Sequence, residues 1–218
     1  MALLGIGVTV EIEATKAAAI TGVTLDKATG VFSKTTHGLV DLDWVIVTCD
    51  GIAELNGMVA RVDQQTADTF KLEDDGTSGG FVVTSAMAGT AATISVAKIL
   101  TWSTASKATT LSGDQGTPDE IDVTLLSATR RSIQFGFAGK QTFRVENLLD
   151  PTGAATILIR AASRAKTAKA LRVTFADGTL MGVNAYWSGG SGFAMAAGDK
   201  ATDAWNATAV AGEVWYNP

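Results

Sequence analysis

Apolar and polar side chains alternate along much of the chain, which is the pattern of strands with one buried face. Near the N-terminus, Val8, Val10 and Ile12 are separated by polar residues. The same period recurs in six later segments, at residues 121–125, 133–137, 143–145, 171–175, 181–187 and 210–216. The pattern predicts a chain that is mainly β.

Two pairs of these segments predict hairpins. Ala138-Gly139 separates residues 133–137 from 140–147, and Asp177-Gly178 separates residues 171–175 from 181–187. Asp-Gly tolerates the positive φ angles that tight hairpin turns need, so the second hairpin carries the stronger signal.

One helix is predicted near residues 151–167. Asp150 can cap it, and Pro151 suits the first helical position, where no N–H partner is required. Arg164, Lys166 and Lys169 crowd its C-terminal end, where positive charge complements the helix dipole. Helical spacing assigns the apolar face to Ala154, Ala155, Leu158, Ala161, Ala162 and Ala165.

Three parts are expected along the chain. Residues 1–16 hold an N-terminal strand, residues 17–97 form a small β-barrel module, and residues 98–218 form a β-sandwich with the one helix. Short strands about ten residues apart are typical of a small barrel. They are predicted at residues 30–33, 44–49, 59–62 and 69–73. The module is an insertion into the sandwich if residues 8–13 pair with later strands.

The net charge and the scarcity of His and Cys argue against some classes of function and site. The 218 residues include 17 Lys and Arg against 22 Asp and Glu, a formal charge of −5. Such a chain is a poor candidate for wrapping nucleic acid, because phosphate binding needs clustered basic residues. The single His and single Cys exclude a Cys/His zinc site and an intramolecular disulfide.

No export or membrane segment is expected. Residues 2–10 are apolar, but no basic residue precedes them, and Glu11 and Glu13 interrupt the run. No apolar stretch reaches the 18 or so residues of a membrane-spanning helix. With one Cys, this predicts synthesis in a reducing cytoplasm.

His37 and Cys49 are the candidates for catalysis, as a general base and as a nucleophile. His37 precedes a glycine in a predicted turn, and Cys49 lies in a predicted strand. Because the two lie in different elements, both are expected to be structural. No catalytic, cofactor-binding or metal-binding residue is predicted.

Other clusters lack a specific spacing. The acidic clusters at residues 41–43, 74–75 and 114–122 do not follow the calcium-loop pattern, and they single out no carboxylate pair for glycoside hydrolysis. Residues 189–192 are glycine-rich without the Lys and Ser/Thr of a phosphate loop. The basic helix end could touch nucleic acid, but a role at the helix terminus is preferred. Core or subunit-interface packing is likewise preferred over base or sugar stacking for Trp187, Trp205 and Trp215.

Residues 19–81 resemble a small β-module of phage tail proteins that is similar to a half-domain of the ubiquitin-activating enzyme family. The resemblance rests on the His37-Gly38 turn, the Glu54-Leu55-Asn56-Gly57 turn and the strand Thr66–Glu73, whose sequence is TADTFKLE. It implies a β-module and no ubiquitin chemistry, so Cys49 is not carried over as a catalytic residue.

From about residue 97 onward, the layout resembles the tail tube proteins of long-tailed, siphovirus-like phages. The matching features are a strand at residues 119–124, the hairpin at 131–147, the Asp150-Pro151 helix and the Asp177-Gly178 hairpin. The resemblance implies a tail-tube-like β-sandwich or barrel with one helix, in hexameric rings that stack into a channel for DNA. It implies other copies of the chain and the tape measure, tail terminator and tail tip proteins as partners, and DNA that passes without specific binding.

Such a protein would reside in the virion tail after synthesis in the host bacterial cytoplasm. The negative charge would keep DNA phosphates from sticking to the channel wall. Contacts between rings are expected at Val8, Val10 and Ile12 and at Asp114, Gln115, Thr117 and Pro118.

Two other classes of function stay open. A tail-tip, collar or decoration protein would use the small barrel to bind a host glycan or another virion protein, and it would be present in few copies per particle. A hydrolase with two carboxylates would need a concave pocket that holds a carboxyl group of raised pKa.

Overall fold

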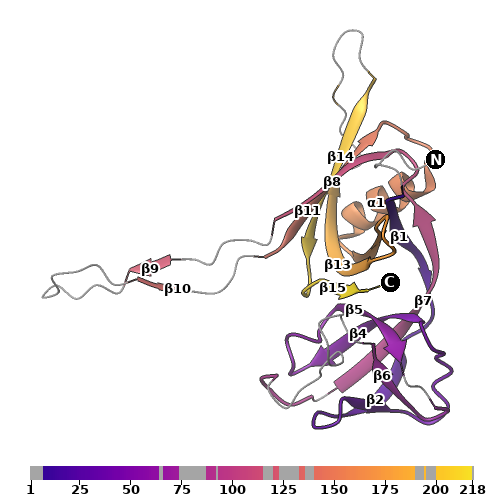
Figure 1. Cartoon of the computed structure of the whole chain (residues 1–218), viewed down its shortest axis with the longest axis vertical. Helices are drawn as coiled ribbons and strands as arrows, with labels where there is room; N and C mark the ends of the chain where they lie inside the picture. The colour runs from indigo at the N-terminus through magenta and orange to yellow at the C-terminus, as the bar shows by residue number, and fades with distance from the viewer. Residues whose placement is uncertain are drawn as a thin grey trace, which may run out of the picture.

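The computed structural model describes residues 7–63, 66–73, 87–91, 93–114, 120–122, 133–135, 140–189, 194 and 200–217. In these residues the protein is mainly β with one helix, α1 (Ala154–Ala165), as the sequence predicted (Figure 1). The strands are β1 (Thr9–Lys16), β2 (Ile20–Asp26), β3 (Val31–Ser33), β4 (Trp44–Asp50), β5 (Met58–Asp63), β6 (Thr69–Leu72), β7 (Thr93–Thr104), β8 (Ala108–Asp114), β9 (Glu120–Asp122), β10 (Ile133–Phe135), β11 (Thr142–Leu148), β12 (Ala168–Thr174), β13 (Leu180–Gly189), β14 (Thr202–Ala209) and β15 (Val214–Tyr216).

A closed six-stranded barrel forms the lower part of the molecule in Figure 1. Its strand order is β2-β3-β6-β5-β4-β7, and a further pairing between β2 and β7 closes it. Phe32 and Phe70 stack inside with ring centroids 5.1 Å apart, and both are almost fully buried. The four strands predicted between residues 30 and 73 are present as β3 to β6, and the expected small barrel is confirmed.

The barrel shares strand β7 with a second sheet. Residues 93–98 of β7 pair with β4, and residues 94–96 also pair with β2. Residues 99–104 pair instead with β1. The boundary expected between residues 97 and 98 therefore falls inside one continuous strand.

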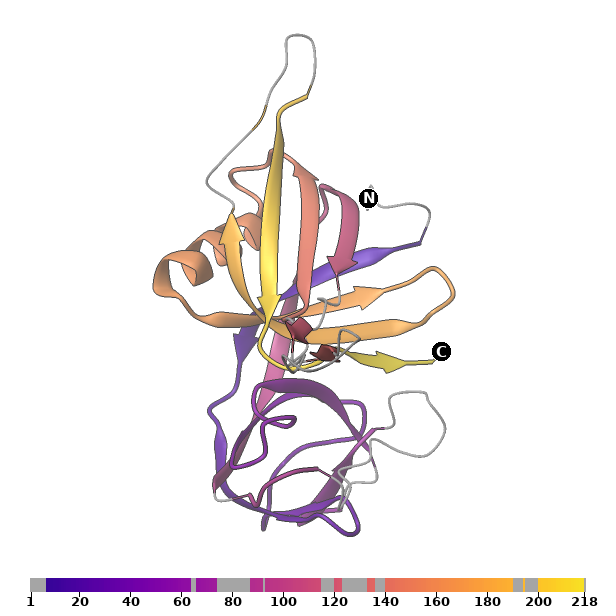
Figure 2. The ribbon, with the colours of Figure 1, turned by 90° about the vertical axis from the view of Figure 1, so that its left-hand side faces the viewer.

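The second sheet has the order β7-β1-β12-β13-β14-β11-β8, with β15 added beside β13. It curls above the barrel in Figure 2, and α1 packs against β13, β1, β7 and β12. Strand β1 pairs with β12 from Thr9 opposite Thr174 to Ile12 opposite Leu171. The N-terminal strand thus belongs to the same sheet as the C-terminal half of the chain, with β2 to β6 between them in the sequence.

The predicted Asp177-Gly178 hairpin is present as β12 and β13, with Leu171 opposite Val183. Its loop has three residues, because the Phe175 N–H donates to the Thr179 carbonyl at 2.8 Å. Gly178 has a φ of 92° and its N–H donates to the Phe175 carbonyl, so the loop is a type I turn followed by a left-handed glycine.

The predicted hairpin across Ala138-Gly139 is wrong. Strand β10 pairs with β9, with Ile133 opposite Asp122. Strand β11 pairs with β8 and β14 instead. In Figure 1, β9 and β10 lie well away from the main sheet, to the left. The turn residues 136–139 themselves lie outside the described residues.

The predicted helix is present, but its cap and its buried face differ. The N-cap is Gly153, without a side-chain cap, whereas Asp150 and Pro151 lie in the turn before it. The buried residues are Ala155, Thr156, Ile159 and Ala162. Because alanines lie on several sides of the helix, their spacing did not identify the buried face. Ile159 rather than Leu158 faces the core.

An aromatic seam joins the barrel to the sheet. The Trp44 ring meets Trp102 and Tyr216 edge to face, with centroids 5.9 and 5.5 Å away. The Arg172 guanidinium lies 4.6 Å from the Trp102 ring centroid. At Gly182 of β13, an added Cβ would lie 2.5 Å from the Trp44 ring, so only glycine fits there. Ala170, Val214 and Tyr216 of the second sheet belong to the same buried apolar cluster as the barrel core.

We predict that Tyr216→Phe destabilises the protein by about 1–3 kcal/mol, because the buried Tyr216 hydroxyl accepts the Arg61 backbone N–H at 2.8 Å and its loss leaves that donor unsatisfied. Thermal denaturation measures the change. The matched control is Tyr186→Phe, which alters the only other tyrosine, and that side chain is half exposed. Equal melting temperatures for the two variants would contradict the seam's contribution.

Candidate functional site

His37 is buried in a turn of the barrel and serves as a scaffold residue. Its Nδ1 accepts the Leu39 N–H at 3.0 Å, which leaves the proton on Nε2 to be donated to the Thr69 carbonyl at 3.3 Å. The ring also meets Phe70 edge to face at 5.1 Å. Both nitrogens are therefore engaged with the backbone, in a turn that ties the segment after β3 to β6.

Cys49 lies in β4 and is 1% exposed. Its Sγ donates a weak hydrogen bond to the Asp50 carbonyl at 3.7 Å. Burial raises the pKa of the thiol, and the Asp50 carboxylate adds to the rise. A thiol that resists ionisation is a poor nucleophile, so the structural role expected from the sequence fits this environment.

In the first acidic cluster, Asp43 stabilises the barrel. Asp43 accepts the Val40 N–H at 2.8 Å and pairs with Lys98 at 2.7 Å. Residues 74–75 lie outside the described part of the chain. Among the residues that the structure describes, no three His, Cys, Asp or Glu side chains are grouped to hold a metal ion. In that same part, no helix has both the length and the apolarity to cross a membrane.

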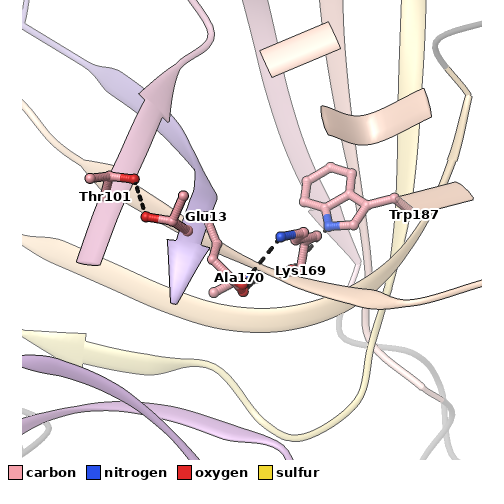
Figure 3. Close-up of polar contacts among 6 residues, drawn as sticks. Glu13, Thr101, Lys169, Ala170 and Trp187 are labelled. Carbon is pink, nitrogen blue, oxygen red and sulfur yellow. Dashed lines mark hydrogen bonds and ion pairs between the residues drawn. The ribbon is translucent and has the colours of Figure 1, made fainter. Parts of the chain in front are cut away.

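Glu13 is the one fully buried carboxylate among the described residues. Figure 3 shows it near Lys169 and Ala170. The pairing of β1 with β12 ends one residue earlier, at Ile12. Glu13 then accepts the Ala170 N–H at 3.2 Å and pairs with the Lys169 ammonium at 3.2 Å. Where the pairing of β1 with β12 ends, the Glu13 carboxylate thus accepts a backbone hydrogen bond that a paired strand would otherwise accept.

Two of the three tryptophans singled out by the sequence are core residues, as expected. Trp187 donates to the Lys169 carbonyl at 3.0 Å, and Trp205 donates to Asp203 at 3.2 Å. Trp215 is different, because it is 40% exposed and stacks on Phe175 with centroids 5.5 Å apart.

The basic residues at and after the end of α1 are divided between partly buried and exposed groups. Lys169 pairs with Glu13, and Arg160 donates to the Pro151 carbonyl at 3.3 Å. Arg164 and Lys166 are exposed. Lys166 is the C-cap, with a φ of 52°, and it ends the helix.

The structure separates the residues expected at ring contacts. Val10 and Ile12 are buried in the sheet's own core, and Val8 packs against the same core. Their side chains are thus occupied within the chain. Asp114 is exposed at the end of β8. Gln115, Thr117 and Pro118 lie outside the described residues, and a contact between rings at any of these positions stays a prediction.

The two end strands of the seven-stranded sheet, β8 and β7, have open edges in the described part of the chain. Strand β8 pairs only with β11. One edge of β7 pairs with β1 and β2. The other edge pairs with β4 only as far as Lys98, so this edge is open along Leu100–Thr104. These two edges are the two ends of the seven-stranded sheet. Unpaired strand edges with no guarding lysine or proline are surfaces for pairing with another chain.

A groove of about 250 Å³ opens beside β8. Its lining includes the aromatic side chains of Phe143, Phe175 and Trp215 and the carboxylates of Asp114 and Glu213. Sequence reasoning did not find it, because its residues come from β8, β11, the β12–β13 turn and β15.

We predict that Cys49 reacts slowly with a thiol reagent such as DTNB in the native protein at pH 8. One equivalent should react rapidly after unfolding in guanidinium, since the chain has a single Cys. Burial and the raised pKa both suppress the thiolate. Rapid native labelling would show that Cys49 is accessible and ionised, contrary to a scaffold role.

Glu13→Ala is expected to lower the free energy of unfolding by about 3 kcal/mol. The substitution leaves the Ala170 N–H and the partly buried Lys169 ammonium without the carboxylate that they contact. The control is Glu146→Ala, which breaks an exposed pair with Arg144 and should cost well under about 1 kcal/mol. Chemical denaturation of both variants gives the comparison. A Glu13→Ala protein as stable as the control would contradict this role.

The chain matches a known protein family over most of its length. The family described as "Phage tail tube protein, TTP" matches residues 50–211, which is well over half of the chain. The matched region runs from the end of β4 to beyond β14, so it includes part of the barrel as well as most of the sheet. A search of curated proteins found no match. Because the family match covers well over half of the chain, and the fold is mainly β with one helix, this chain belongs to the phage tail tube protein family.

Proposed function

We propose that the protein is the major tail tube subunit of a siphovirus-type phage and forms stacked hexameric rings around a channel for DNA. The observation that carries the proposal is the pair of open edges at the two ends of one sheet, in a chain of the tail tube family. A head-to-tail contact that joins one end of this sheet to the other end of the next pairs both end strands once a ring has closed.

The proposed partners follow from the assembly. Each copy contacts other copies, and the finished tube contacts the tape measure, tail terminator and tail tip proteins. The protein is made in the host cytoplasm and ends in the virion tail. The formal charge of −5 supports a channel through which DNA slides, since a negative wall repels phosphates.

Contacts between rings are proposed near the end of β8, at Asp114 and the following Gln115, Thr117 and Pro118. Because Val10 and Ile12 are buried in their own chain, the N-terminal strand would contribute through its backbone or through Val8. The barrel would lie outside the channel, as an appendage similar to the modules of other tail proteins.

We predict that the purified protein assembles into rings or tubes as its concentration rises. Light scattering after size exclusion gives the mass, and negative-stain microscopy shows the particles. A protein that stays monomeric at high concentration, even with its tail-assembly partners present, would refute the proposal. In purified phage particles the band should correspond to many copies, whereas a few copies would indicate the tail-tip, collar or decoration role.

A further inference from the structure

The groove beside β8 combines an aromatic wall with acceptor groups. Phe175 and Trp215 stack on each other, and Trp215 is 40% exposed. Asp114 and Glu213 add carboxylates to the lining, one oxygen of Glu213 is buried, and the described lining contains no Lys or Arg. The described lining is therefore acidic and aromatic, which is the chemistry that attracts a Lys or Arg side chain.

A buried acceptor in the same groove points to the same ligand. The side-chain oxygen of Gln141 is buried and has no hydrogen-bond partner among the described residues. Leaving a buried acceptor without a donor is costly. A guanidinium or ammonium group that entered the groove would supply that donor and would lie against the aromatic rings.

The chain itself displays a matching basic surface. Arg164 and Lys166 are exposed at the C-terminal end of α1, whereas Lys169 is held by Glu13. In Figure 2, α1 lies at the left of the sheet, and the β12–β13 hairpin and β15, which line the groove, reach to the right. The basic end and the groove thus lie on opposite sides of the same half of the molecule.

Complementary surfaces on opposite sides of one chain produce a heterologous contact, which repeats from copy to copy and closes into a ring or continues as a filament. We propose that the groove formed by Phe143, Phe175, Trp215, Gln141, Asp114 and Glu213 receives Arg164 and Lys166 of a neighbouring copy. This inference rests on the proposed self-assembly, and it names the side chains that hold neighbouring copies together beside the strand edges.

Charge reversal on each surface tests the contact. The groove variant is Asp114→Lys with Glu213→Lys, and the helix variant is Arg164→Glu with Lys166→Glu. Each alone should raise the concentration needed for assembly about tenfold or more, because like charges then face each other across the contact. An equimolar mixture should restore assembly, since the reversed groove fits the reversed helix end and the native surfaces still fit each other.

The matched control for the groove variant is Asp41→Lys with Glu54→Lys, which changes the net charge equally at exposed barrel positions. It should assemble at the wild-type concentration. Circular dichroism and thermal denaturation check that every variant is folded. Light scattering and microscopy measure assembly, at low and at raised salt, since salt should weaken the wild-type contact.

The outcomes separate this inference from the proposed function. If the wild-type protein forms rings and the groove variant forms them equally well, the groove contact is wrong and the tube function stands. If both variants fail singly but their mixture also fails, the two surfaces do not bind each other and the inference is overturned. A wild-type protein that never assembles overturns both.

Discussion

The hydrogen-bonding capacity of strand β7 determines the architecture. A strand has two edges, and along residues 93–98 the barrel strands occupy both of them. Beyond Lys98 only β1 remains, so the same strand passes from a closed barrel into a sheet with an open end. A twelve-residue strand is stiff, and the barrel and the sheet are consequently fixed to each other by backbone as well as by side chains.

Side chains then complete the connection that β7 begins. The Trp44, Trp102 and Tyr216 rings fill the space between barrel and sheet, and Gly182 leaves room for Trp44. On the other side of β1, Glu13 covers the Ala170 N–H that β1 no longer pairs. Burying a charge there is tolerated because Lys169 and a backbone donor both meet it.

The sequence predicted β4 to β6 as short strands about ten residues apart, and it predicted the β12–β13 hairpin from alternation around Asp177-Gly178. It missed β14, although the buried positions of that strand alternate regularly. It missed β2 because only Val23 of that strand is fully buried, and it missed β8 because an edge strand needs little apolar surface. The sequence predicted which segments form strands better than it predicted which strands pair. Strand β10 pairs with a strand earlier in the chain rather than with the next one, and nothing local distinguishes the two. The burial of Glu13 could not be predicted from local sequence either, because its partner Lys169 is 156 residues away in the chain.

The barrel also limits how copies can join. In the proposed ring, a strand that adds to the open edge of β7 has only Leu100–Thr104 to pair with, because β4 occupies that edge up to Lys98. The end of β4 is therefore a stop against which the incoming strand must halt. A stop of this kind fixes the register of pairing, which a bare edge leaves free to slip by two residues with the same side chains inward. Strand β8 has seven residues, a length comparable to the available edge, and its groove brings charged and aromatic contacts to the same junction. Backbone pairing would then supply the strength of the contact, and the groove and the β4 stop would supply its specificity.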